Sequence, residues 1–77
     1  MRLAKIQQFM QQRNMPFDYY EEDGCGSINF THKGLLYHIW EFSDPEMGCE
    51  SNVRSCGRSE DYVGDYEQQI LDILATW

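Results

Sequence analysis

The sequence is short of positive charge. Its 77 residues contain six Lys and Arg against thirteen Asp and Glu, which gives a formal net charge of -7 at pH 7. Proteins that bind DNA, RNA or anionic lipid directly usually gain affinity by neutralising phosphates with Lys and Arg. We therefore expect neither a nucleic-acid-binding protein nor one that binds a membrane surface.

The chain also lacks long apolar runs. No stretch reaches the roughly 18 apolar residues of a membrane-spanning helix, and no basic segment followed by an apolar run opens the sequence. Three cysteines, an odd number in a chain without a secretory pattern, do not make a disulfide framework. These features predict a cytoplasmic protein with three free thiols.

Sequence motifs that carry chemistry are missing as well. The chain has no glycine-rich phosphate loop, nucleophile elbow or HExxH run, so we expect no enzyme and no cofactor. Cys49 and Cys56 are remote from Cys25, and His32 and His38 are expected on opposite faces of a sheet, which is a poor pattern for a metal. A small metal- or ligand-binding domain using Cys49, Cys56 and a His remains the alternative function.

The remaining composition favours one folded domain over residues 1–77. Hydrophobic residues make up 42% of the chain and aromatic residues 14%, enough to supply a core for a chain of this length. Apolar residues recur at helical spacing between Arg2 and Arg13, which predicts a first helix. Asn14, followed by Met15-Pro16, predicts where it stops, because Asn tolerates the left-handed position after a helix and Pro cannot continue one.

Three strands are expected next. Residues 17–22 alternate, residues 23–26 supply a turn, and residues 27–32 and 35–42 flank Lys33-Gly34. A two-residue loop pairs His32 with Leu35 and thereby fixes which side chains share a face. One face then holds Ile28, Phe30, Leu35, Tyr37 and Ile39 and forms the core, and the other holds Ser27, Asn29, Thr31, Leu36, His38, Trp40 and Phe42.

The last third of the sequence is harder to assign. Residues 43–51 have the composition of a loop, and Asn52 to Cys56 fit either a short edge strand or irregular chain. A helical stripe starts at Ser59, with Asp65-x-x-Gln68 as a second, later start and Gly64 as a weak point. The predicted fold is an α+β two-layer sandwich, a meander of three or four antiparallel strands with the N-terminal and C-terminal helices on one face.

The second face of this sheet is the main candidate site. Leu36, His38, Trp40 and Phe42 form a row of large side chains where a monomer would expose polar ones, and exposed apolar patches often mark binding sites. Three alternatives could cover this row: the chain itself, a second copy, or a different protein. The chain's own cover would be either the loop of residues 43–51 or the C-terminal helix.

Charged residues suggest two further surfaces. Arg54 and Arg58 are the only cations after Gly34, and they either pair with nearby acids or form an anion clamp. The acidic residues cluster, which indicates either a solvated surface or contact with a basic partner. The acidic surface is assigned to Asp18, Glu21, Glu22 and Glu60.

Two resemblances bear on these expectations. The order helix, three strands, helix resembles the double-stranded RNA-binding domain in topology, but "SEDYVGDYE" stands where that family has a Lys cluster. The runs "YYEEDGCGSINF", "GLLYHIWEF" and "ESNVRSCGRSEDYVGDYEQQI" resemble short proteins of bacterial chromosomes and prophages that have no established activity. This second resemblance implies an intracellular accessory or phage-derived protein.

Together these observations predict a small acidic protein-interaction module or inhibitor. Its contact surface would be the row of Leu36, His38, Trp40 and Phe42, bound to another protein or to a second copy in a homodimer. One version is an inhibitor that presents its acidic residues to the basic, nucleic-acid-binding site of a target. We expect no metal, no nucleic acid and no membrane among its ligands.

Overall fold

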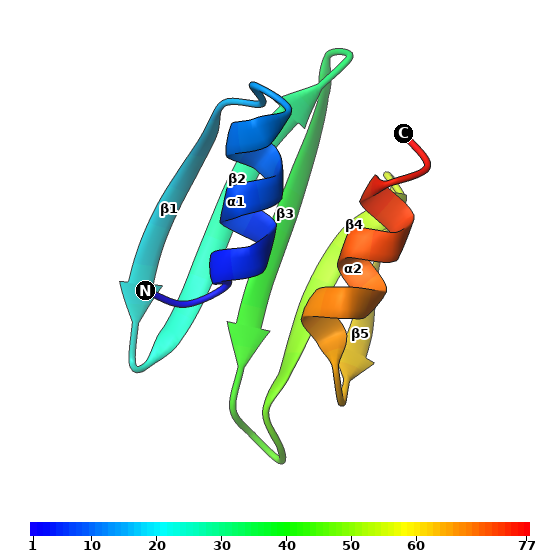
Figure 1. The fold of residues 1–77 in the computed structure, drawn as a ribbon. Coiled ribbons are helices and arrows are strands. Elements are labelled where there is room, and N and C mark those ends of the chain that lie inside the picture. Colours follow the sequence, from blue (N-terminus) through cyan, green and yellow to red (C-terminus); the bar gives the residue numbers. More distant parts are fainter.

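The protein contains two helices packed on one face of a five-stranded antiparallel sheet, in a computed structural model that describes residues 1–77 (Figure 1). The strands lie in the sheet in the order in which they occur in the chain. The elements are α1 (Ala4–Gln12), β1 (Phe17–Glu22), β2 (Cys25–His32), β3 (Leu35–Phe42), β4 (Gly48–Ser55), β5 (Arg58–Val63) and α2 (Tyr66–Leu74).

The predicted α+β class is confirmed, but the predicted number of strands is too low. The expected loop ends at Met47, because residues 48–51 already belong to β4 and pair with β3. The short edge strand over Asn52 to Cys56 is wrong in its bounds and its place, since β4 runs from Gly48 to Ser55 between β3 and β5. The topology therefore differs from the three-strand order of a double-stranded RNA-binding domain.

The start of the last helix also needs correction. Residues 58–63 form the edge strand β5, so the helix does not begin at Ser59. Gly64 ends the strand with a φ of 77°, a left-handed conformation that glycine adopts without strain. Asp65 then caps α2, and its carboxylate accepts a hydrogen bond from the backbone N–H of Gln68 at 3.4 Å. The later of the two predicted starts is the correct one.

The first helix ends as its sequence predicts. Asn14 takes a left-handed conformation with a φ of 56°, directly after the C-cap Arg13. On the face of α1 that meets the sheet, Ile6 and Met10 are fully buried, and Leu3 is buried just before the helix.

The register of the central hairpin is the predicted one. His32 pairs with Leu35, Phe30 with Tyr37, and Ile28 with Ile39. Only Leu35 departs from the expected core face, because it is 48% exposed at the tip of the hairpin. The core between sheet and helices consists of Leu3, Ile6, Met10, Ile28, Phe30, Ile39, Cys49, Val53, Ile70 and Leu74.

The N-terminal ends of the two helices are joined by a carboxylate. No side chain caps α1 at Leu3. Instead, Glu67 in the first turn of α2 accepts hydrogen bonds from the backbone N–H groups of Lys5, at 2.9 Å, and Ile6, at 3.2 Å. Both helices start at the same end of the sheet, so one acid satisfies free N–H groups of α1 and also favours the positive end of α2 (Figure 1).

Replacing Glu67 by alanine tests this shared cap. We expect the Glu67→Ala variant to lose about 1 kcal/mol of unfolding free energy, the usual cost of removing a helix cap. Asp72→Ala is the matched control, because Asp72 is an acid of the same helix whose carboxylate contacts only Gln68. Urea denaturation of both variants decides the point, and an equal loss in both would show that the contact to α1 contributes nothing.

Candidate functional site

The face of the sheet opposite α1 and α2 is the candidate site. Strand register and alternation define this helix-free face. Along the five strands it presents Asp18, Tyr20 and Glu22 from β1; Cys25, Ser27, Asn29 and Thr31 from β2; Leu36, His38, Trp40 and Phe42 from β3; Gly48 and Glu50 from β4; and Ser59, Asp61 and Val63 from β5.

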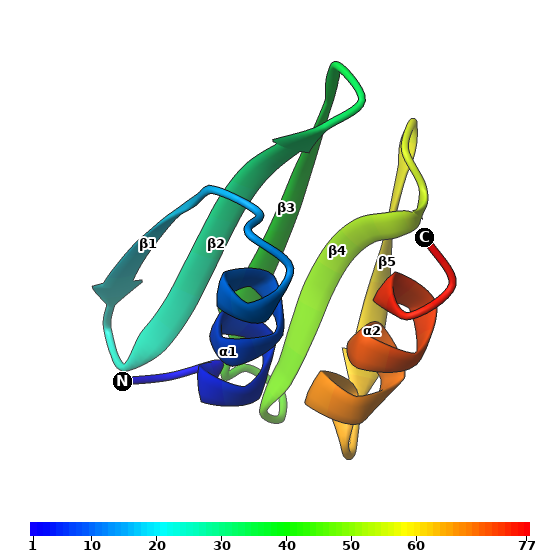
Figure 2. The same cartoon turned by 45° about the horizontal axis from the view of Figure 1, so that its top comes forward.

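Large apolar side chains are exposed mainly on this face. Leu36 is 75% exposed and Trp40 39%, and Tyr20 and Val63 are exposed as well. These four are most of the large hydrophobic side chains that the protein exposes, the others being Met1 and Leu35. By register, the predicted row of Leu36, His38, Trp40 and Phe42 therefore lies together on one face. Both helices lie on the other face of the sheet (Figure 2).

Both expected forms of cover by the chain itself are wrong. Helix α2 packs on the opposite face, where Ile70 and Leu74 enter the core. Residues 48–51 cannot fold over Trp40, because they are part of β4 and lie beside β3, with Glu50 paired to Trp40. The exposed fraction of Trp40 agrees with an uncovered face.

The Trp40 indole is held in place by two neighbours. The ring of His38 stacks on it, with 4.2 Å between ring centroids and 28° between planes. Its Nε1–H donates a hydrogen bond to Oδ1 of Asn29 at 3.3 Å. A large aromatic group whose orientation is fixed before binding loses little conformational entropy in a complex, which is the property of an interface anchor.

His38 contacts a hydroxyl and a carboxylate but does not form a catalytic triad. Its Nε2 atom lies 3.0 Å from Oγ of Ser59 and 3.5 Å from Oε2 of Glu50. In a Ser-His-acid triad the acid binds Nδ1 and leaves Nε2 to the nucleophile. Here both groups meet the same nitrogen, so the arrangement orients the His38 ring under Trp40 and supplies no relay.

Phe42 completes the row by covering Gly48. A Cβ atom built on Gly48 would lie 2.6 Å and 2.8 Å from ring atoms of Phe42 and 2.8 Å from the carbonyl oxygen of Tyr62. The ring of Phe42 therefore occupies the space that a side chain on β4 would fill. This close approach requires glycine at position 48.

Asn52 closes a gap in the sheet beside the row. Beyond Ser51 the pairing of β4 with β5 shifts, and the β2–β3 and β4–β5 hairpins diverge toward their turns (Figure 2). The amide of Asn52 takes over the missing backbone contacts. It accepts from the N–H of His38 at 2.9 Å and donates to the carbonyls of Leu36 and Cys56 at 3.1 and 3.0 Å. The backbone of β3 at Leu36 and His38 is therefore hydrogen-bonded by Asn52, although β4 no longer pairs with it at these positions.

The predicted acidic residues divide between the two sides of the sheet. Asp18 and Glu22 lie on the helix-free face, whereas Glu21 and Glu60 belong by register to the opposite side. The helix-free face carries four carboxylates in total, those of Asp18, Glu22, Glu50 and Asp61.

No unpaired Lys or Arg side chain lies on this face. Arg54 follows the core residue Val53 in β4, but its guanidinium is paired with Glu60 of β5. The remaining cations lie before, in or directly after α1, in the Lys33-Gly34 turn, or at Arg58 on the helix side of β5. Arg54 is thus already occupied by Glu60, while Arg58 forms no ion pair. The predicted anion clamp would have to break the Arg54–Glu60 pair before both groups could bind an anion.

The cysteines do not converge on a metal position. Cys49 is buried on the helix side of β4, and Cys56 lies in the β4–β5 turn. Burial, followed by the nearby charge of Glu41, raises the pKa of the Cys49 thiol to about 12, which keeps it in the neutral form that is a poor metal ligand. No three His, Cys, Asp or Glu side chains form a group that could hold a metal ion.

A buried carboxylate at one end of the sheet was not expected from the sequence. Glu41 of β3 faces the helices, and its side chain is only 2% exposed. It accepts hydrogen bonds from Nε and Nη2 of Arg2 at 2.6 and 3.1 Å, from the backbone N–H of Gly26 at 2.8 Å, and from the hydroxyl of Tyr66 at 2.5 Å. The backbone N–H of Arg2 in turn donates to the hydroxyl of Tyr19 at 2.8 Å. This polar cluster ties the segment before α1, the sheet and α2 together.

The surroundings of Glu41 set its protonation state. Burial by itself acts to raise its pKa, but the hydrogen bonds from Arg2, Tyr66 and Gly26, with the charge of Arg2, together lower the pKa below its ordinary 4.5. Burial and the hydrogen bond to Glu41 raise the pKa of Tyr66 to about 12. Glu41 is therefore an ionised structural group with every partner in place, not an acid held ready for proton transfer.

Comparison with known proteins adds no identification. No protein-family model, no curated protein and no solved structure matches this chain. None of the helices has the length and apolar character required to cross a membrane.

Proposed function

We propose that this protein is a non-enzymatic interaction module whose helix-free face binds another protein. The observation that carries the proposal is the composition of that face. It joins exposed Tyr20, Leu36, Trp40 and Val63 with four carboxylates and no unpaired Lys or Arg. Aromatic anchors surrounded by polar groups are typical of protein interfaces, and the acidic charge favours a basic partner surface.

The charge of the helix-free face also favours a different protein over a second copy of this chain as its binding partner. A symmetric dimer places the same patch of both subunits at the interface. Two helix-free faces would bring the carboxylates of Asp18, Glu22, Glu50 and Asp61 together with those of the other copy, without an unpaired Lys or Arg to neutralise them. A partner with a basic, partly apolar surface meets no such repulsion, and an inhibitor of a nucleic-acid-binding protein is one form of this proposal.

Adjacent leucines on β3 provide the test. Leu36 lies on the helix-free face and Leu35 on the other, and both are exposed at the hairpin tip. We expect Leu36→Asp to weaken binding of the captured partner at least about 5-fold, because loss of a central apolar contact typically costs more than 1 kcal/mol. Leu35→Asp should bind like the wild type. The variants and wild type are immobilised, exposed to bacterial lysate, and compared by quantitative mass spectrometry and then with the purified partner.

Three results would contradict the proposal. The first is that no protein distinguishes the Leu36 variant from the Leu35 variant. The second is a captured protein whose binding does not weaken as salt is raised, since pairing with the carboxylates should be screened. The third is a dimer in light scattering that Leu36→Asp dissociates and Leu35→Asp does not, which would make a second copy the occupant. Circular dichroism of both variants shows that each is folded.

A further inference from the structure

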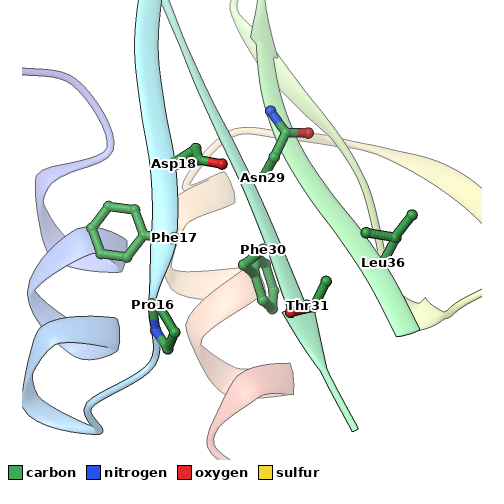
Figure 3. Close-up of a pocket in the computed structure, with 7 residues that line it drawn as sticks. All are labelled: Pro16, Phe17, Asp18, Asn29, Phe30, Thr31 and Leu36. Atoms are coloured by element: carbon green, nitrogen blue, oxygen red, sulfur yellow. The ribbon is translucent and has the colours of Figure 1, made fainter. Parts of the chain in front are cut away.

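The helix-free face has one depression, which lies where β1, β2 and β3 run side by side. Its volume is about 270 Å³, and Pro16, Asp18, Asn29, Thr31 and Leu36 surround it (Figure 3). It is the only pocket in the protein. Asp18 and Asn29 are directly paired across β1 and β2, and Thr31 and Leu36 are paired across β2 and β3.

The depression lies over the middle strand, between side chains of the two neighbouring strands. Asn29 and Thr31 belong to β2, with Asp18 of β1 on one side and Leu36 of β3 on the other (Figure 3). Phe17 and Phe30 also line the depression, and both pack with the core on the helix side. The hollow is therefore formed by residues of three strands together with Pro16, which directly precedes β1.

The walls of the depression combine one negative charge with apolar surface. Asp18 forms no ion pair within the chain. Oδ1 of Asn29 accepts from Trp40 at 3.3 Å and retains a second lone pair. Pro16 and Leu36 supply the apolar part. A carboxylate beside apolar walls is complementary to a side chain with an aliphatic stem and a cationic end.

Arginine fits this surface better than lysine. Its planar guanidinium can donate two parallel hydrogen bonds to one carboxylate, here that of Asp18, and it is more weakly hydrated than an ammonium group, so a shallow and half-apolar site costs it less solvation. A lysine ammonium would lose strongly bound water and gain a single point contact. The geometry therefore favours an arginine side chain inserted between Pro16 and Leu36.

We propose that this depression is a specificity pocket for an arginine side chain of the partner protein. The inference rests on the proposed function, since it names the group that the helix-free face selects. Trp40 and Leu36 would supply apolar contact beside the pocket. Asp18 would give specificity, because it would favour partners that present an arginine at this position.

The pocket is tested with small probes in place of a partner. Backbone amide NMR spectra of the whole chain are recorded during titration with N-acetyl-arginine-methylamide, the lysine analogue and the uncharged citrulline analogue. We expect saturable shifts for arginine centred on Asp18, Asn29, Thr31 and Leu36, several-fold weaker binding of lysine, and no saturation with citrulline. Asp18→Asn should weaken arginine binding at least about 10-fold, a loss in line with one charge-assisted hydrogen bond of about 1.5 kcal/mol or more.

Glu22→Gln is the matched control, because Glu22 lies on the same strand and face but outside the depression. This variant should bind the arginine probe like the wild type. Three results would overturn the pocket. The first is amide shifts near all acidic residues that do not saturate with the arginine probe. The others are a citrulline or lysine probe that binds as tightly as the arginine probe, and an Asp18→Asn variant that binds the arginine probe as tightly as the wild type.

The outcome is separable from that of the proposed function. A partner whose binding depends on Leu36 but is unchanged by Asp18→Asn overturns the pocket and leaves the interaction face standing. Saturable arginine binding at Asp18 without any Leu36-dependent partner supports the pocket and counts against the larger proposal.

Discussion

Replacing Glu41 by alanine is expected to reduce the unfolding free energy by about 3 kcal/mol, the cost of removing one member of a buried, hydrogen-bonded charge pair. The variant leaves the N–H of Gly26 and the hydroxyl of Tyr66 without their acceptor, and it leaves Arg2 without its counter-charge. Arg2 is partly exposed and can be rehydrated, so most of the loss arises from Gly26 and Tyr66. For a small domain this is a large share of a total stability of roughly 5 kcal/mol.

Glu50→Ala is the control for this measurement. Glu50 is an acid on the next strand, paired with Trp40, but its side chain is partly exposed and contacts only His38. Its loss should change stability by no more than about 0.5 kcal/mol, as for most surface positions. Urea denaturation at pH 7 compares the two variants. Similar values for both would show that the polar cluster around Glu41 contributes no more than a surface pair.

The dependence of unfolding free energy on pH provides a second test of the polar cluster around Glu41. Because folding lowers the pKa of Glu41, ionised Glu41 stabilises the folded state above its ordinary pKa of 4.5, and this stabilisation is lost as the pH falls through the lower folded value. Glu41→Gln cannot titrate at this position. The difference in unfolding free energy between wild type and this variant should therefore shrink below pH 4.5 and stay constant between pH 6 and 8. A difference that grows in acid would mean that the pKa of Glu41 is raised.

The parts of the fold that were predicted share a visible apolar pattern. Ile28, Phe30 and Ile39 alternate with polar residues, and Lys33-Gly34 fixes how they pair. Large side chains on both faces of β3 therefore predicted the row of Leu36 and Trp40 before the structure located the helices. Alternation and turn length were sufficient, because a shift of one residue would exchange the two faces of the hairpin.

Strand β4 was not predicted because most of its buried positions carry small or polar residues. Gly48, Cys49, Ser51 and Asn52 are buried, and Val53 is the only buried residue of the strand with a branched apolar side chain. Their burial arises from long-range partners: the Ser51 hydroxyl donates to the carbonyl of His38 at 2.7 Å, and Asn52 bonds the β3 backbone. Local propensity contains no information on such contacts.

The mistaken prediction of a helix starting at Ser59, where the structure has β5, has a different cause. Tyr62, Val63 and Tyr66 are spaced like one face of a helix, but Glu60 and Tyr62 alternate equally well as a strand. Gly64 decides between the two, because its left-handed backbone separates β5 from the Asp65 cap of α2. The polar cluster around Glu41 could not be predicted from the sequence either, because its partner Arg2 is 39 residues away along the chain.

The last prediction concerns the glycine beneath Phe42. Gly48→Ala is expected to cost about 2 kcal/mol, within the usual range for overpacking a well-packed site. The new methyl group would meet the Phe42 ring at 2.6 Å on one side and the carbonyl of Tyr62 at 2.8 Å on the other, and the backbone cannot yield as a flexible side chain would. The ring must therefore turn away from β4 and disturb the end of the row on the helix-free face.

Gly57→Ala provides the comparison, because a Cβ atom at Gly57 meets nothing within 4 Å and its backbone is not left-handed. It should stay within about 0.5 kcal/mol of the wild type. Thermal and urea denaturation measure the cost, and NMR shifts of the Phe42 and Trp40 rings report whether the displacement is local. If Gly48→Ala is as stable as Gly57→Ala, Phe42 does not rest on Gly48. If stability falls while Trp40 and partner binding are unchanged, Phe42 supports the sheet without belonging to the contact surface.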